Sequence, residues 1–228
     1  MINQYALKLD KELTSSQLRD LSLVVTDERR KKSERYLYTK DIERSLVSEA
    51  LLIYLLKEKY LMKNKDIIFS YSQYGKPFLK GSKLEFNISH SGDWIVCTIA
   101  DNPVGVDVEI IQFLDFKSIY RTFSKEEILY FSDLDLAQTE NLFFKLWTLK
   151  ESFVKYNGKG LIYPFDSFSI DITNLSIFID DSNIEDVSFY SKKLDDEHWY
   201  AICYHSNEEL PEIQFLNLNE ILDYYESC

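Results

Sequence analysis

The chain contains little glycine, proline or cysteine. Its 228 residues include 6 glycines, 4 prolines and 3 cysteines. Cys97, Cys203 and Cys228 are widely spaced and form no C-x-x-C pair, so they predict neither a disulfide framework nor a zinc site. Free cysteines suit a reducing cytosol. Because glycine and proline are scarce, those that fall within a motif mark places where the backbone has special requirements.

Long apolar runs are also missing, as is any excess of positive charge. The longest apolar run, Ala50–Leu56, is far too short to cross a bilayer. Met1–Asp10 lacks the apolar core of a signal peptide. We therefore expect a cytoplasmic protein without a membrane segment. The formal net charge of −12 counts against nucleic-acid binding, which needs a basic surface, and an anionic ligand would need a local basic pocket.

The chain does contain enough apolar residues, 45% of the total, to bury a core. The order of helical and strand patterns predicts an α+β fold with two similar halves, residues 1–102 and residues 103–228. We expect strands over Ile2–Leu9, Asp66–Tyr71, Leu84–Ser89, Trp94–Ala100, Val104–Ile110, Ser167–Ile170, Leu175–Ile179, Val187–Ser191 and Trp199–Tyr204, helices over Ser15–Val24, Asp41–Tyr60, Ser124–Phe131 and Thr139–Tyr156, and a closing strand and helix within Ile213–Tyr225.

Two carboxylates lie on one predicted strand, in the pentapeptide Gly105–Glu109. Alternate side chains of a strand share a face, so Asp107 and Glu109 point the same way. Two adjacent oxygen ligands suit magnesium, which also keeps waters and binds substrate phosphates. The alternative is an ordinary half-buried strand with a charged solvent face.

A third carboxylate, Glu151, lies on the second long helix. Trp147, Glu151 and Lys155 follow one another at steps of four and so share a face, and Lys150 adjoins it. Glu151 and Lys155 could form only a surface ion pair, worth about 0.3–0.5 kcal/mol. A helix that faces a pocket would explain all four residues, with Glu151 binding metal or taking a proton and the lysines holding phosphate.

A cluster of small and polar residues, Asn87–Gly92, joins two predicted strands. His90 there could bind an anion together with backbone N–H groups, or it could only cap a turn. The chain has no G-x-S-x-G elbow, P-loop or G-x-G-x-x-G motif. The run Asp27–Lys32 is densely basic, which is typical of a solvated helix face.

In order along the chain, four blocks resemble the signature blocks of the 4′-phosphopantetheinyl transferases of the surfactin-synthetase-activating type. They are Gly75–Pro77, Phe86–Ser91, Val104–Glu109 and Trp147–Lys155, the last reading W-x-x-K-E-S-x-x-K. The resemblance runs from about Arg29 to about Ser169. It implies two similar α/β halves, coenzyme A in the cleft between them, and a monomer. The C-terminal half would carry the metal site.

The resemblance also implies roles for the residues of these blocks. Asp107, Glu109 and Glu151 match magnesium ligands, and Glu151 matches the general base. The catalytic set would be Glu151, His90 and Lys155. The residues that match contacts to coenzyme A are Lys150 and Lys155 at phosphates, Ser89 and His90 at the pyrophosphate, Gly75, Lys76 and Pro77 beside the adenine, and Arg29, Lys32 and Arg44 at the 3′-phosphate and nucleotide.

The activity implied is transfer of 4′-phosphopantetheine from coenzyme A to a serine of an apo acyl or peptidyl carrier protein, releasing 3′,5′-ADP. Ile111–Phe123 is a candidate docking surface for the carrier, or else ordinary core. Two other hypotheses remain: a metal-dependent phosphodiesterase acting on nucleic acid, and a coenzyme A-binding module without transfer activity. The low positive charge counts against the first, and the presence of all three carboxylates counts against the second.

Overall fold

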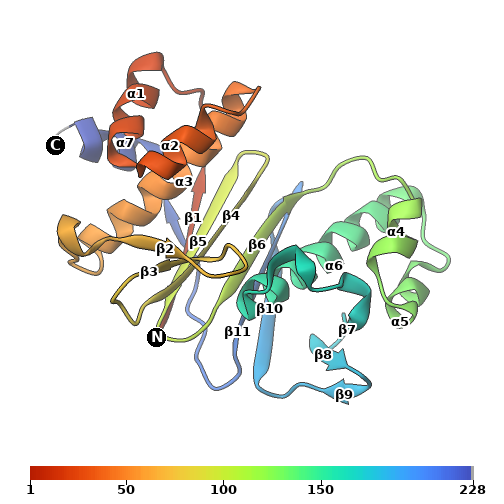
Figure 1. Ribbon diagram of the computed structural model, residues 1–228. Coiled ribbons are helices and arrows are strands. Elements are labelled where there is room, and N and C mark those ends of the chain that lie inside the picture. The colour runs from red at the N-terminus through yellow and green to blue at the C-terminus, as the bar shows by residue number, and fades with distance from the viewer. Residues whose placement is uncertain (227–228) are drawn as a thin grey trace.

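The computed structural model describes residues 1–226, and it has a mixed α/β architecture with two similar halves, as expected. Figure 1 shows α1–α3 and α7 on one side, α4–α6 on the other, and the long strands between them. The elements of the first half are β1 Ile2–Lys8, α1 Ser15–Val24, α2 Asp27–Ser33, α3 Thr39–Glu58, a 3₁₀ turn Asn64–Asp66, β2 Phe69–Tyr71, β3 Pro77–Leu79, β4 Glu85–Ser91 and β5 Trp94–Ala100.

The rest of the chain forms a second helix–sheet unit and then returns to the first. Its elements are β6 Gly105–Ile110, α4 Lys117–Thr122, α5 Lys125–Ile128, a 3₁₀ turn Leu129–Phe131, α6 Leu136–Asn157, 3₁₀ turns Gly160–Ile162 and Phe165–Ser167, β7 Phe168–Asp171, β8 Ser176–Ile179, β9 Ser182–Asn183, β10 Val187–Asp195, β11 His198–His205, β12 Gln214–Leu216 and α7 Leu218–Glu226.

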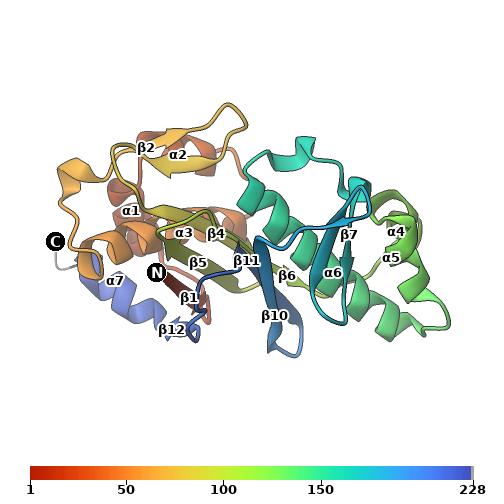
Figure 2. The same ribbon diagram turned by 90° about the horizontal axis from the view of Figure 1, so that it is seen from below.

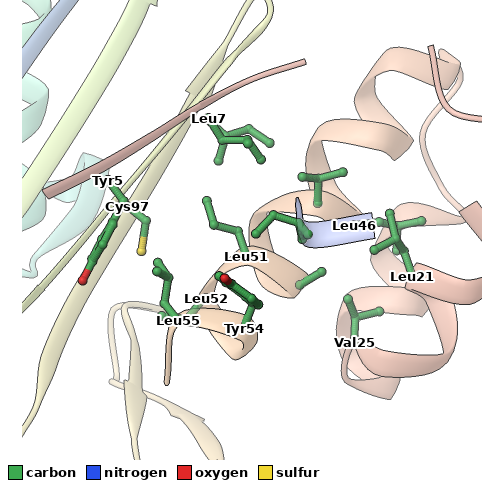
Figure 3. Packing of buried hydrophobic residues seen from close by; sticks show 14 of the residues in the cluster. Tyr5, Leu7, Leu21, Val25, Leu46, Leu51, Leu52, Tyr54, Leu55 and Cys97 are labelled. Atoms are coloured by element: carbon green, nitrogen blue, oxygen red, sulfur yellow. The ribbon is translucent and has the colours of Figure 1, made fainter. Parts of the chain in front are cut away.

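The first half is built on α3, which packs against the sheet β12-β1-β5-β4. Figure 3 shows leucines of α3 between Tyr5, Leu7 and Cys97 of the strands and Leu21 and Val25 near α1. Each fully buried leucine contributes roughly 1.5–3 kcal/mol, so this cluster fixes α3 on the sheet. All seven residues of β5 are buried, because this strand is covered on both faces.

The second half repeats this plan with α6 against the sheet β10-β11-β6. Asp135 caps the N-terminus of α6, where it forms a reciprocal capping box with Gln138. Gly158 ends the helix in a left-handed conformation, with φ of 74°. The helix therefore begins three residues before the expected Thr139, because the cap lies outside the apolar pattern.

Where the two halves meet, side chains of β4 hydrogen-bond to the backbone of β6. Asn87 Oδ1 accepts from the N–H of Val106 at 2.9 Å, and Ser91 Oγ accepts from the N–H of Ile110 at 3.1 Å. β4 continues to Ser91, two residues beyond the expected end. Figure 2 gives a second view of β4, β5, β6 and β11 at this junction. The polar residues of the Asn87–Gly92 cluster are thus mostly strand residues held against β6.

The C-terminal segment crosses back to the first half. β12 pairs in parallel with β1, and α7 packs on α1 and α3. Tyr225 Oη donates to the carbonyl of Ala50 at 2.7 Å. Residues 214–226 therefore pack with the N-terminal unit, and the division at residue 102 stays a prediction. No helix within residues 1–226 is long and apolar enough to cross a membrane.

Candidate active site

β6 lies unusually close to α6 because Gly105 has no side chain. A Cβ at Gly105 would lie 2.0 Å from the carbonyl oxygen of Ser152 and 2.3 Å from the backbone nitrogen of Tyr156. No side chain fits at such distances. The close approach brings Asp107 of β6 beside Lys155 of α6.

Asp107 is the buried centre of the site. Its side chain is 2% exposed, and Oδ1 accepts from Lys155 Nζ at 2.6 Å and from Ser89 Oγ at 2.7 Å. Lys155 Nζ also lies 2.8 Å from Ser89 Oγ. The other carboxylate oxygen, Oδ2, is buried and has no hydrogen-bond partner among residues 1–226. Burial raises the pKa of Asp107, and the charge of Lys155 partly opposes the shift.

Two further carboxylates, Glu109 and Glu151, lie close enough to Asp107 for its negative charge to raise the pKa values of both glutamates. Burial, and then the charge of Asp107, raise the pKa of Glu109 to about 7, and Glu151 adds to this shift. Burial and the charge of Asp107 likewise raise the pKa of Glu151 to about 7. Ser91 Oγ donates to Glu109 Oε2 at 2.8 Å. The three side chains form one patch of mutually repelling charge.

The residues of this patch suit a hard divalent cation. The donors are carboxylate oxygens, one of them is buried without a partner, and two carboxyls gain from a nearby positive charge. As the side chains stand, no three Asp, Glu, His or Cys groups among the described residues could hold a metal ion. The ammonium of Lys155 occupies the Oδ1 side of Asp107, which leaves Oδ2 as the free ligand atom.

A cavity of about 330 Å³ opens beside the carboxylates and is lined by both halves of the chain. α2, α3, the β2–β3 turn and β4 form one part of its wall, and the end of α6 forms another. Lys155 lines this cavity and also contacts Asp107, so it joins the cavity to the carboxylate patch. The predicted site residues in the wall are Arg29, Lys32, Gly75, Lys76, Pro77, His90 and Lys155.

The cations around the cavity affect its one histidine. His90 lines the cavity, and its desolvation by the surrounding protein, followed by the charges of Arg44 and Lys155, lowers its pKa to about 4. Burial also lowers the pKa of Lys76, whose Nζ lies 3.4 Å from the carbonyl oxygen of Val104. The shift of the His90 pKa reflects nearby positive charge as well as burial, and an anion bound beside His90 would relieve both effects.

Lys150 does not lie in this cavity, so its placement does not fit the predicted phosphate contact. Its side chain is fully buried, and Nζ donates to both oxygens of Glu127, at 2.8 and 2.6 Å, and to the carbonyl of Phe168 at 2.7 Å. All three ammonium protons are therefore used within the protein. Trp147, which shares a helix face with Lys155, stacks on Phe165 instead of facing the cavity.

Arg44 also lies outside the cavity beside the carboxylates. Its guanidinium donates to the carbonyl of Gly92 at 2.8 Å and to Asp41 at 2.5 Å, and it lines a separate, smaller cavity. Arg44 therefore holds the β4–β5 turn in this structure, and its effect on His90 is electrostatic.

Several residues in the cavity wall were not predicted from the sequence. Ser48 and Glu49 of α3 and the aromatic pair Tyr71 and Tyr74 contribute to it. Glu49 carried a usable signal, because it is an acidic residue inside the buried stretch Leu46–Leu56 of α3. A buried acid in such a helix requires a partner.

Comparisons with known proteins identify the family of this chain. A family model described as 4′-phosphopantetheinyl transferase superfamily matches residues 103–203, and one described as 4′-phosphopantetheinyl transferase, N-terminal, matches residues 12–102. Among curated proteins, 4′-phosphopantetheinyl transferase gsp of Aneurinibacillus migulanus is 34% identical over 204 residues, which cover 89% of this chain and 86% of that protein.

A second relative covers almost the whole chain. It is 4′-phosphopantetheinyl transferase Sfp of Bacillus subtilis, 31% identical over 226 residues, which cover 96% of this chain and 99% of that protein. The residues matched by the two family models, 12–102 and 103–203, include the carboxylate patch and the cavity wall. The chain therefore belongs to the 4′-phosphopantetheinyl transferase family.

Proposed function

We propose that this transferase moves the 4′-phosphopantetheine group of coenzyme A onto a serine hydroxyl of an apo acyl or peptidyl carrier protein and releases 3′,5′-ADP. The observation that carries the proposal is the Asp107–Lys155–Ser89 cluster, where a carboxylate patch adjoins a cationic cavity. Coenzyme A carries a pyrophosphate and a phosphate monoester, and such a ligand needs both features.

Asp107, Glu109 and Glu151 would hold Mg²⁺, with Oδ2 of Asp107 as the free buried ligand atom. A bound Mg²⁺ would neutralise charge on the pyrophosphate and polarise the phosphorus that is attacked. The same ion would remove the repulsion that raises the pKa values of Glu109 and Glu151.

The side chains around the ion would handle the proton and the phosphate. Glu151, whose pKa is raised to about 7, accepts the proton of the carrier serine. The serine oxygen then forms a bond to the β-phosphorus, and the bond from that phosphorus to the bridging oxygen breaks, so that 3′,5′-ADP carries away the electron pair. Lys155, Ser89 and His90 contact the pyrophosphate and stabilise its developing charge.

The rest of the cavity wall would bind the nucleotide. Gly75, Lys76 and Pro77 form the turn beside the adenine, and Gly75 supports it with φ of 85°. Arg29 and Lys32 of α2 supply positive charge for the remaining phosphate. Because this positive charge is local, an enzyme of net charge −12 can still bind a polyanion.

The segment Ile111–Phe123 is proposed as the docking surface for the carrier. Phe113 is 84% exposed and Tyr120 is 72% exposed, whereas Leu114 and Ile119 point into the core. The segment thus exposes aromatic side chains to solvent while other side chains hold it against the core, which suits a protein interface. We further propose that the enzyme works as a cytosolic monomer.

The rival hypotheses fit the molecule less well. A phosphodiesterase acting on nucleic acid would need a basic tract, which a cavity of about 330 Å³ with a few cations does not supply. A binding module without activity would have no use for Asp107, whose burial destabilises its charge.

The proposal is tested by measuring the release of 3′,5′-ADP from coenzyme A. Release should require Mg²⁺ and an apo carrier together, and a chelator should abolish it. Release without a carrier would indicate hydrolysis instead of transfer. Cleavage of a labelled DNA or RNA by the same preparation would favour the phosphodiesterase.

A further inference from the structure

The short helix α2 differs from other helices of this chain at its N-terminus. α1, α5 and α6 each begin with a capping box, in which Gln17, Glu127 or Gln138, three residues after the cap, accepts the backbone N–H of the cap residue. In α2 the cap is Thr26, and the residue three positions on is Arg29. Arginine has no acceptor atom, so α2 cannot complete the box with its own residues.

Glu49 of α3 supplies the missing acceptor. Its Oε1 accepts from the backbone N–H of Thr26 at 2.6 Å, and its Oε2 accepts from Nε of Arg29 at 2.9 Å. The side chain of Glu49 is 5% exposed and that of Arg29 is 21% exposed. One buried carboxylate therefore holds both the start of α2 and the guanidinium of Arg29.

This arrangement is paradoxical for a site that binds a polyanion, because Glu49 and Arg29 both line the cavity. A free carboxylate there would repel the ligand, and an arginine in the first turn of a helix is disfavoured by the helix dipole. The ion pair neutralises Glu49 and uses Nε of Arg29. Among residues 1–226 the side chain of Arg29 hydrogen-bonds only through Nε, so its two terminal nitrogens stay available to a ligand in the cavity that Arg29 lines.

The position of Arg29 indicates which phosphate it meets. Lys155 and Ser89 adjoin the carboxylate patch, where the transferred phosphate must lie, so they bind the pyrophosphate. Arg29 lies on α2, a separate part of the cavity wall, and the remaining phosphate of coenzyme A is the 3′-monoester. We infer that Glu49 is a positioning residue that orients Arg29 for the 3′-phosphate and so sets the preference for coenzyme A over 3′-dephospho-coenzyme A.

This inference rests on the proposed function and is tested by calorimetric binding of both nucleotides to the wild type and to Glu49→Gln. Glutamine keeps one acceptor oxygen but cannot serve Thr26 and Arg29 together. The Kd for coenzyme A should rise about tenfold, as expected for the loss of one charge-assisted hydrogen bond, and the Kd for 3′-dephospho-coenzyme A should not change. In a transfer assay, KM for coenzyme A should rise similarly while kcat falls less than twofold.

Arg29→Gln is the matched variant. The new glutamine could complete the capping box of α2 itself, which offsets part of the loss of the ion pair with Glu49, so the melting temperature should fall only slightly. The preference for coenzyme A should nevertheless be lost. In the double variant Arg29→Gln/Glu49→Gln, binding of coenzyme A should be no weaker than in Arg29→Gln alone, because Glu49 acts through Arg29.

Several results would overturn the inference. These are equal affinity of the wild type for both nucleotides, an equal loss of both affinities in Glu49→Gln, and additive effects of the two substitutions. Should Glu49→Gln fail to fold, Arg29→Lys decides, since a retained preference would show that the oriented guanidinium is not needed. Failure of transfer with the binding preference intact would refute the proposed function and leave the role of Glu49 standing.

Discussion

At the scale of single residues, Asp107 connects the lysine and serine of the proposed phosphate site with the two glutamates of the proposed metal site. Replacing it by asparagine keeps its shape and removes its charge. We expect Asp107→Asn to lower carrier modification by about a thousandfold or more, because both Lys155 and the metal lose their shared anion.

The fold should survive this change, since burial already disfavours the charge of Asp107. The measurements are the transfer rate and the melting temperature of the same preparation. Near-normal turnover by folded Asp107→Asn would refute the assignment of Asp107 as a metal ligand.

Lys150 and Lys155 belong to one sequence motif but have different roles in the structure. Lys150→Met would leave Glu127 buried without its partner and should reduce the free energy of unfolding by about 3–5 kcal/mol. Lys155→Met also takes the ammonium partner from Asp107, but Ser89 still donates to that carboxylate and Lys155 is partly exposed, so the loss of stability should be smaller, whereas transfer should be abolished.

Denaturant unfolding and the KM for coenzyme A separate the two roles. The structural role of Lys150 predicts that KM changes little at a temperature where the variant is folded. A stable Lys150→Met enzyme with a strongly raised KM would instead support a phosphate contact.

At the scale of elements, the contact between β6 and α6 positions the carboxylate patch. Gly105→Ala would place a methyl group against the backbone of α6 and force the two elements apart. We expect a loss of about 3 kcal/mol or more in the free energy of unfolding, together with loss of transfer, because Asp107 moves away from Lys155.

Gly81→Ala is the matched control for this substitution. Gly81 has φ of 77° and open space around its Cβ position, so alanine there meets strain but no clash. Its cost should be about 1 kcal/mol, and transfer should be retained. Equal effects of the two substitutions in chemical denaturation would contradict the packing argument.

The residue pattern within each segment explains which helices and strands could be predicted from the sequence. The helix predicted over Ser15–Val24 and the strand predicted from the β-rich run Trp94–Ala100 have the bounds that the structure shows. α4, Lys117–Thr122, was not expected, since six residues without a side-chain cap carry no periodic signal. β4 extends through His90 and Ser91 because Ser91 bonds to β6, a contact between distant segments.

The same limit applies to the site. Strand geometry placed Asp107 beside Glu109, and helix geometry placed Glu151 beside Lys155, whereas the meeting of the two pairs was implied only by the family resemblance. Lys150 could not be assigned, because its role depends on Glu127, which lies on another helix, 23 residues away. The role of Glu49 depends likewise on how α2 packs against α3.

At the scale of the whole molecule, the carboxylate patch should link stability to pH. Glu109 and Glu151 have folded-state pKa values of about 7, above their ordinary value of 4.5. Between pH 4.5 and 7 the folded state holds protons that the unfolded state has lost. The contribution of these groups to stability therefore falls as pH rises through this window, and stays low above it.

A cation bound to the patch would reverse this loss. We expect Mg²⁺ to raise the melting temperature by several degrees at pH 8 and by much less at pH 5. Glu109→Gln and Glu151→Gln should weaken the response in scanning calorimetry, whereas Glu126→Gln, on the exposed surface, should not. A response that is the same at both pH values would place the ion elsewhere.

The most direct test of transfer is the intact mass of an apo carrier protein after incubation with the enzyme, coenzyme A and Mg²⁺. We expect a gain equal to one phosphopantetheine, with no gain when the acceptor serine of the carrier is replaced by alanine or when a chelator is present. A folded enzyme that binds coenzyme A but leaves the mass of several apo carriers unchanged would contradict it.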